Sequence, residues 1–298
     1  MRVTVGLPFS DQHEFLAAAI RSVLNQTYCD WRLLLVADGA TSAALATARA
    51  VKDERVDLIV RPDRRGLAVR LNEIATLAEG EVLFRMDADD VMAPHRIGKQ
   101  LEFLDQHPGI DLVGSRAYLI DELSTVQGRY VEADLPVDPA GYLNNGVFTH
   151  PTVAGRRDWF RENPYNEGLL LGQDKELWLR TFRHSSFAKL EEPLLFYRVQ
   201  STISRGKRMK SSAYSKKIVR ELGPEHVGSR STQRHLFRAW IKDALFVASS
   251  MNSRTSLAMY RRKCEELTAD ELNAANELFG RATAQSDATL EFRNQGTA

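Results

Sequence analysis

The stretch EVLFRMDADD, residues 81–90, joins a short and mostly apolar run to three carboxylates. We expect residues 81–86 to form a buried strand. An extended chain sends alternate side chains the same way, so Asp87 and Asp89 should converge. Carboxylates this close repel one another unless a cation or a hydrogen-bonded ligand offsets their charge. Oxygen ligands suit a hard divalent ion, so the stretch predicts a Mg²⁺ or Mn²⁺ site. The alternative is a solvated turn in which Asp90 caps the next helix.

Outward from this stretch, strand and helix patterns alternate along the first hundred residues. The expected strands are 2–7, 31–36, 56–60 and 81–86, and the expected helices begin at Asp11 and cover 42–51 and 67–78. This order predicts an α/β fold with a Rossmann-like, mainly parallel sheet flanked by helices. Ligands of such sheets bind beyond the carboxyl ends of the strands, which groups Pro8, Asp38 and residues 87–90.

The second half of the chain is less regular, with an irregular segment between residues 121 and 145. The expected helices are 94–107 and 174–182, and the expected strands are 111–119, 187–190 and 194–199. After residue 201 the chain becomes basic and polar over 205–217, and helical patterns follow at 232–251 and 256–279. The sequence therefore predicts an α/β domain at 1–200, then a basic linker and a helical C-terminal region at 201–298.

The charge balance and the cysteines set the broad class of protein. The 298 residues carry 40 Lys and Arg against 39 Asp and Glu, a net charge of +1, so nothing favours nucleic acid as a partner. Two distant cysteines, Cys29 and Cys264, suggest a reducing compartment. No stretch has the apolar length of a signal peptide or a membrane span. We therefore expect a cytoplasmic protein.

Several short motifs occur in a fixed order along the chain. They are SVLNQTY at 22–28, DG at 38–39, GLAVRLN at 66–72, DADD at 87–90, Met92-x-Pro94-x-Arg96, HPT at 150–152 and GQDKELWLR at 172–180. In this order and at this spacing they resemble glycosyltransferase family 2 over roughly residues 3–198. The resemblance implies a GT-A fold with a nucleotide-sugar-binding half at 1–105 and an acceptor half at 106–200, and a hexosyltransferase activity.

The resemblance also implies how the sugar donor is held. Pro8 would lie in the first loop beside the nucleotide, and Asp38 would hydrogen-bond the base. Asp87 would hold the ribose or the sugar. By their position in the chain, Arg61, Arg64, Arg65 and Arg70 lie where the donor diphosphate or base could be reached. We expect one of them at most to bind it and choose Arg65; the alternative is a solvated charged loop. UDP is the nucleotide that the family uses most, so a UDP-sugar is the expected donor, with dTDP and GDP as alternatives.

The same resemblance assigns the metal ligands. Asp89, the second acid of the D-x-D pattern, would ligate the metal that bridges the diphosphate, and Asp90 and His150 would be further ligands. The ion, Mn²⁺ or Mg²⁺, would act as a Lewis acid that stabilises the negative charge on the departing nucleoside diphosphate.

Asp174 corresponds to the residue that serves as catalytic base in the family. A sugar hydroxyl is a weak nucleophile, so a carboxylate within hydrogen-bond reach must accept its proton as the new bond forms. A single displacement of this kind inverts the anomeric centre. The structural alternative is that Asp174 caps the helix that follows it, and a helix N-terminus would also stabilise its carboxylate.

Four positions depart from the family pattern: residues 10 and 11 lack the usual aromatic and Asn, Ala37 replaces an acid, and Gln173 replaces a Glu. They keep open a nucleotide-sugar-binding or scaffold protein with little turnover. A nucleotidyltransferase is a further alternative, although residues 6–11 lack its glycine-rich phosphate loop.

The acceptor and the C-terminal partners stay open at this level. The acceptor hydroxyl would belong to a carbohydrate, a lipid-linked sugar or another molecule. The basic segment 205–217 has three interpretations: a lid over the donor phosphates, a patch for an anionic acceptor or the inner face of the membrane, or a solvated linker. The helices beyond residue 232 would pack on the main domain or form a homodimer.

Overall fold

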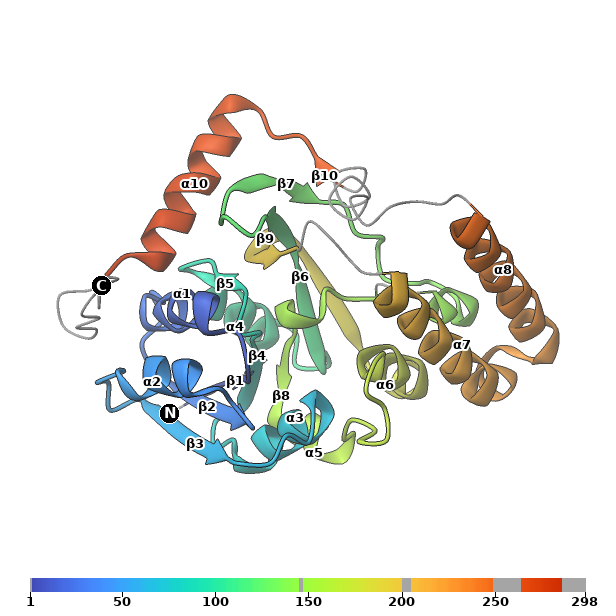
Figure 1. Ribbon diagram of the computed structural model, residues 1–298, viewed down its shortest axis with the longest axis horizontal. Coiled ribbons are helices and arrows are strands. Elements are labelled where there is room, and N and C mark those ends of the chain that lie inside the picture. The colour runs from blue at the N-terminus through green and yellow to red at the C-terminus, as the bar shows by residue number, and fades with distance from the viewer. Residues whose placement is uncertain (1, 145–146, 200–204, 249–263, 286–298) are drawn as a thin grey trace.

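The computed structural model describes residues 2–144, 147–199, 205–248 and 264–285. Its first half is built on four parallel strands in the order β3-β2-β1-β4 (Figure 1). The strands are β1 (Val3–Phe9), β2 (Trp31–Asp38), β3 (Val56–Arg61) and β4 (Val82–Arg85). β1 and β2 are apolar and buried over nearly their whole length, as expected for parallel strands covered on both faces. The Rossmann-like half of the prediction is therefore confirmed.

Beyond β4 the sheet becomes mixed. β8 (Ala154–Arg156) runs antiparallel to β4 and to β6 (Leu112–Ile120), and β6 pairs in parallel with β9 (Phe187–Arg198). The predicted strands at 187–190 and 194–199 are one strand, because a register shift in β6 accommodates the residues between them. The remaining strands are β5 (Val91–Met92), β7 (Val126–Tyr130) and β10 (Cys264–Glu265). β7 lies in the segment that sequence periodicity left irregular.

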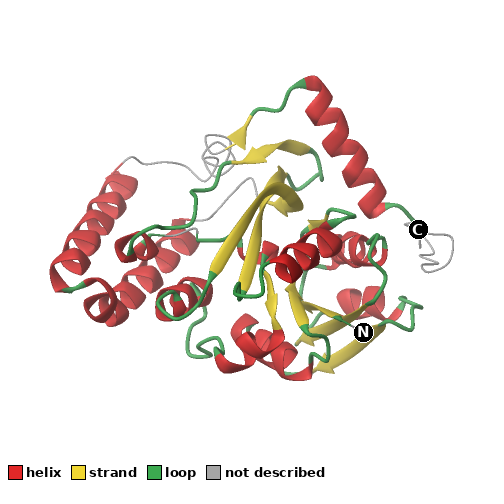
Figure 2. Cartoon of the chain, turned by 180° about the vertical axis from the view of Figure 1, so that it is seen from behind, coloured by secondary structure: helices red, strands yellow, loops and turns green. Residues whose placement is uncertain are grey.

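Helices cover both faces of the sheet, as the view from behind also shows (Figure 2). One face carries α1 (His13–Leu24), α2 (Ser42–Arg49) and α4 (Arg96–Gln106), and the other carries α3 (Leu67–Leu77), α5 (Arg157–Glu162) and α6 (Gln173–Thr181). Gly6 lets α3 approach β1, because a Cβ there would lie 2.4 Å from Ile74 Cγ2. The N-cap of α1 is Gln12, one residue after the predicted cap Asp11, whose Oδ2 accepts a hydrogen bond from Arg64 Nη1.

The C-terminal region is helical from its first described residue. α7 (Arg205–Val227) replaces the predicted linker at 205–217, and it is followed by α8 (Ser229–Ala248) and α10 (Ala269–Thr283). The predicted helix at 256–279 is wrong at residues 264–268, where β10 pairs with β7 before Thr268 caps α10. Residues 249–251 and 256–263 of the predicted helices lie outside the described part. Among the described residues, no helix is both long and apolar enough to cross a membrane.

The C-terminal helices attach to the main domain at two separate places. α10 packs across α1 and β5, with Ala275 and Ala282 in a buried cluster (Figure 1). α7 packs on α6 through Ile218 and Val219. The helix that carries Asp174 is therefore covered by α7, and the domain boundary near residue 200 stays a prediction.

Candidate functional site

Asp87, Asp89 and Asp90 follow directly on β4, and their ligand-type oxygens all lie within 4.8 Å of one another. The predicted convergence of the D-x-D acids is therefore confirmed, and Asp90 joins them. Asp90 does not cap the following helix, since the N-cap of α4 is His95. Instead its Oδ1 accepts a hydrogen bond from the backbone N–H of Arg198, at the end of β9, at 2.8 Å. Two distant strands thus fix the cluster.

Burial and mutual repulsion make this cluster unfavourable as three free carboxylates. Burial, then the charge of Asp87, raises the pKa of Asp89 to about 6. Burial and both neighbouring acids raise the pKa of Asp90 well above its ordinary value. Asp90 Oδ2 is buried and has no hydrogen-bond partner. An all-oxygen donor set with a buried acceptor left over fits a hard divalent cation, whose charge would offset the repulsion.

Arg85 is a site residue that the sequence analysis missed. Its side chain is only 4% exposed, and its Nη2 lies 2.6 Å from Asp87 Oδ1. Its Nε and Nη1 are buried without a hydrogen-bond partner. The guanidinium also interacts electrostatically with Asp174, where it partly offsets the rise in pKa that burial causes. A single charged residue inside the otherwise apolar strand β4 is the signal that could have identified it.

Asp174 is the second residue of α6, and the residue at the N-cap is Gly172 at φ +76°. The capping alternative is therefore not found. The carboxylate accepts a hydrogen bond from the backbone N–H of Lys175, as expected of an acid in the first turn of a helix. Burial outweighs this bond and raises the pKa of Asp174. A raised pKa suits a proton acceptor. Glu176, in the same turn, forms an ion pair with Arg180, with 2.8 Å between Glu176 Oε1 and Arg180 Nε.

His150 begins a short 3₁₀ helix, η2 (His150–Thr152), and its Nε2 lies 2.8 Å from Tyr165 Oη. Burial lowers its pKa well below the ordinary value, so the ring is neutral at pH 7. It lies outside the three-acid cluster, and its role as a metal ligand stays a prediction. Trp178 of α6 is buried and packs edge-on against the His150 ring, as expected of a core residue beneath the site.

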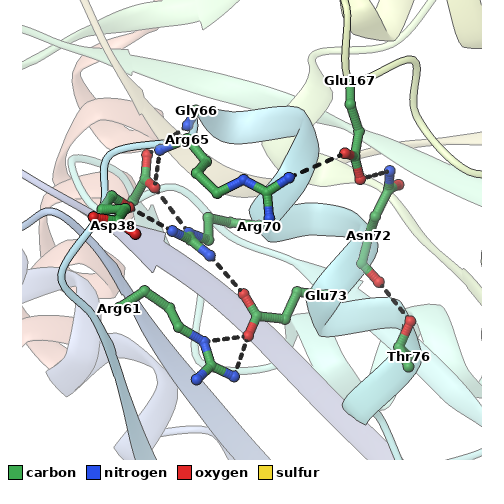
Figure 3. Close-up of polar contacts among 10 residues, drawn as sticks. Asp38, Arg61, Arg65, Gly66, Arg70, Asn72, Glu73, Thr76 and Glu167 are labelled. Carbon is green, nitrogen blue, oxygen red and sulfur yellow. Dashed lines mark hydrogen bonds and ion pairs between the residues drawn. The ribbon is translucent and has the colours of Figure 1, made fainter.

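Asp38, at the end of β2, organises the loop that follows β3 (Figure 3). Its Oδ1 accepts hydrogen bonds from the backbone N–H of Arg65 and from Arg70 Nε, each at 2.8 Å, and its Oδ2 accepts from the Gly66 N–H at 2.9 Å. Arg70 is buried, and its Nη1 also lies 2.9 Å from Glu73 Oε2. Three accepted bonds leave lone-pair capacity on the carboxylate for a further donor such as a base N–H. Base recognition by Asp38 stays a prediction.

Beside this network the surface is hollowed to about 500 Å³, with Arg61, Arg65, Arg70 and Glu167 among the lining residues. Arg65 is more than half exposed there, and its Nη2 lies 3.7 Å from Glu167 Oε2 (Figure 3). Arg70, another of the four candidate arginines, is the one fixed to Asp38. The placement of Arg65 leaves it free to turn toward a ligand, and its donor contact stays a prediction.

Pro8 lies inside β1 rather than in the loop that follows, because β1 extends through Phe9. This corrects the predicted end of the strand at residue 7. β4 pairs with β1 only from Val3 to Gly6. Proline has no backbone N–H to donate, but at position 8 the side of β1 that faces β4 has no pairing strand, so no hydrogen bond of the sheet is lost. Its contact with a nucleotide stays a prediction.

The buried pairing of Asp38 predicts a measurable loss of stability. Asp38→Asn removes the charge beside Arg70 and turns one acceptor into a donor, while Glu73 still pairs with the guanidinium. We expect the free energy of unfolding to fall by about 2 kcal/mol, the size of a hydrogen bond to a charged group. The matched control is Asp57→Asn, whose partner Arg32 lies on the partly exposed surface, with an expected loss below about 1 kcal/mol. Urea denaturation measures both, and equal losses would contradict the role given to Asp38.

The comparison with known families accords with this site. The family model of glycosyl transferase family 2 matches residues 4–163, more than half of the chain. EpsE of Bacillus subtilis strain 168, assigned as a glycosyltransferase, is 30% identical over 221 residues, which cover 72% of this chain and 78% of that protein. The O-antigen biosynthesis glycosyltransferase WbnJ of Escherichia coli is 28% identical over 202 residues, covering 63% and 76%. The chain belongs to glycosyltransferase family 2, and it is a glycosyltransferase.

Solved structures show the same fold at low identity. The Staphylococcus aureus protein TarS, residues 1–349 in complex with UDP, superposes with a TM-score of 0.59 at 14% identity, covering 95% of this chain and 80% of that one. The mannosyltransferase PcManGT of Pyrobaculum calidifontis, in complex with GDP-Man and Mn²⁺, superposes with a TM-score of 0.55 at 14% identity, covering 94% and 84%. The predicted GT-A fold, with helices at the C-terminus, is therefore confirmed.

Proposed function

We propose that this glycosyltransferase moves a hexosyl group from a nucleoside diphosphate sugar to an acceptor hydroxyl, with inversion at the anomeric carbon and with bound Mn²⁺ or Mg²⁺. The observation that carries the proposal is the partly buried cluster of Asp87, Asp89 and Asp90, with Arg85 linking it electrostatically to Asp174. A UDP-sugar is our choice of donor. Solved structures of the same fold hold UDP, UDP-GlcNAc or GDP-Man with Mn²⁺, which supports the donor class.

The three acids would hold the cation, and the cation would supply Lewis-acid stabilisation to the leaving diphosphate. Asp89 and Asp90 carry the raised pKa values that a nearby cation would reverse. Arg85 Nη2 holds the Asp87 carboxylate at 2.6 Å, in a position to contact the donor. Asp38 and the loop it organises would surround the base, with Arg65 at the rim of the hollow.

Asp174 would take the proton of the acceptor hydroxyl. Its place at the start of α6 gives the carboxylate a fixed direction, since the backbone N–H of Lys175 holds it. Its burial raises its proton affinity, which helps a base that must take a proton at the moment of attack. We propose a carbohydrate or lipid-linked sugar as the acceptor class, and the O-antigen role printed for the relative WbnJ supports it.

Calorimetric titration of the purified protein with UDP, dTDP and GDP, with and without Mn²⁺, tests the donor and the metal together. We expect one nucleotide, UDP, to bind tightly only when the metal is present. Chelation should lower transfer at least about 100-fold, the effect of losing several kcal/mol of charge stabilisation. NMR of the product anomer tests inversion. Metal-independent nucleotide binding would refute the metal site, and binding without any transfer to a panel of sugar acceptors would favour the scaffold alternative.

A further inference from the structure

The outer face of α8 is apolar and exposed over its C-terminal half, residues 237–247. Phe237 and Trp240 are 67% and 60% exposed, and Ile241, Leu245 and Val247 continue the same face. Their spacing of three or four residues places them on one side of the helix. α8 lies at the edge of the molecule farthest from α1 and α10 (Figure 1). A continuous face with two aromatic rings is unlike the scattered apolar residues of an ordinary surface.

This apolar face is flanked by basic side chains of the same helix. Arg234, Arg238 and Lys242 recur at spacings of four residues, and all three are exposed. The sequence from 205 to 248 holds 11 Lys and Arg against 3 Asp and Glu, a net charge of +8. Since the whole chain carries +1, the rest of the protein carries −7. The α7–α8 hairpin therefore carries a large excess of positive charge, whereas the rest of the protein is net negative.

The opposite face of α8 already has its packing partner. Gly223 of α7 admits Thr232, because a Cβ at Gly223 would lie 2.7 Å from the threonine Oγ1. Asp243 accepts a hydrogen bond from Ser212 of α7 at 2.8 Å. Lys216 of α7 lies 4.7 Å from the centre of the Trp240 ring. The hairpin is therefore held together by the inner face of α8. Trp240 lies at the border of the two faces, because it contacts Lys216 of α7 and is still 60% exposed.

We propose that the α7–α8 hairpin docks the enzyme on a lipid bilayer that carries anionic headgroups. Helices that lie in a membrane interface combine Trp, Phe and Leu on one face with Lys and Arg beside it, which is the arrangement on α8. Tryptophan favours the level of the headgroups, and each nearby basic residue adds attraction to an anionic leaflet. A second copy of this face is disfavoured, because a two-fold contact would bring two hairpins of net charge +8 together.

Docking through this hairpin would also orient the catalytic domain. Lys175, the neighbour of Asp174 on α6, donates a hydrogen bond from Nζ to Ser215 Oγ of α7 at 2.7 Å. Ile218 and Val219 of α7 are buried against the same part of the protein. The helix that bears Asp174 is thus joined directly to the docking hairpin. The docking surface itself does not depend on the proposed donor, metal or base.

Flotation of the full-length protein with phosphatidylcholine vesicles, with and without phosphatidylglycerol, tests the proposal. We expect binding to the anionic vesicles only, and release at high salt because the charge attraction is screened. Phe237→Ser/Trp240→Ser removes the two rings, and Arg234→Glu/Arg238→Glu reverses two flanking charges. Each double variant should bind at least about 10-fold more weakly. Wild-type protein that stays unbound at low salt would overturn the proposal.

Two matched variants separate docking from general surface effects. Leu123→Ser removes an exposed apolar residue on the turn before β7, and Arg49→Glu/Lys52→Glu reverses two exposed charges near α2. Both should bind vesicles like the wild type. Thermal melting verifies that every variant is folded, and nucleotide titration verifies the donor site independently. Sedimentation that shows a dimer in the wild type and a monomer in Phe237→Ser/Trp240→Ser would assign the face to a second copy and refute membrane docking.

Discussion

Replacing Asp174 by Asn is expected to lower the rate of sugar transfer by about 10²–10⁴-fold, the usual contribution of a general base. Asparagine keeps the size of the side chain, and its oxygen can still accept from the Lys175 N–H, so α6 should stay intact. It cannot take a proton from the acceptor hydroxyl. Donor binding should be unchanged, because the three-acid cluster and Asp38 are untouched. Single-turnover assays with the identified donor measure the loss, and calorimetry measures the binding.

The chain offers a matched control for this substitution. Asp270 is the second residue of α10, the same helical position that Asp174 occupies in α6, but it is exposed. Asp270→Asn should leave transfer unchanged. If Asp174→Asn and Asp270→Asn transfer at the same rate, Asp174 is not the base. If Asp174→Asn also loses donor binding, its role lies in holding the donor rather than in proton transfer.

Two substitutions only two residues apart, Asp87→Asn and Asp89→Asn, are expected to change stability in opposite directions in metal-free buffer. Asp87 is the ion-pair partner of Arg85, which is 4% exposed, cannot lose its proton and has two further buried N–H groups without partners. Removing the charge of Asp87 leaves that buried guanidinium without its direct ion-pair partner. We expect a loss of about 3–5 kcal/mol in the free energy of unfolding.

Asp89 should behave in the opposite way because its pKa is raised in the folded state. Burial and Asp87 raise that pKa from 3.8 to about 6, so between these values the folded protein binds more protons than the unfolded chain. Stability therefore falls as the pH rises from about 4 through about 6. Asp89→Asn removes this cost, and at pH 7 we expect Tm to rise by about 2–4 °C, the shift that roughly 1 kcal/mol gives in a domain of about 150–250 residues.

Thermal melting of both variants and the wild type from pH 4 to pH 8, in the presence of chelator, checks these signs. The advantage of Asp89→Asn should shrink below pH 6 and vanish near pH 4. Adding Mn²⁺ should raise the Tm of the wild type, since a ligand that binds only the folded state stabilises it, but not that of Asp89→Asn. If Asp87→Asn and Asp89→Asn changed the Tm equally at pH 7, the ion pair with Arg85 would not be the reason for a difference between the two acids.

The sequence by itself determined the β-α order of the first hundred residues and the convergence of the D-x-D acids. Both follow from local periodicity: apolar runs form buried strands, helical spacing forms the covering helices, and alternation along an extended chain brings Asp87 and Asp89 together. The motifs were also sufficient to place the chain in its family, because they mark the residues that would surround one nucleotide-sugar donor. The start of α6 at Asp174 was placed within one residue for the same local reason.

Only the tertiary structure decided how these groups are held and charged. The charge of Arg85 in an apolar strand marks it as unusual, but its position between Asp87 and Asp174 exists only after α6 packs across the sheet. The hydrogen bond that holds Asp90 comes from the backbone N–H of Arg198, 108 positions away in the chain. The apolar pattern of α8 was visible in the sequence, but whether it is buried or exposed depends on which face α7 covers. Periodicity identifies the apolar face of a helix or strand. Whether that face is buried, which pKa a side chain has and which residue it contacts depend on what the fold places against it.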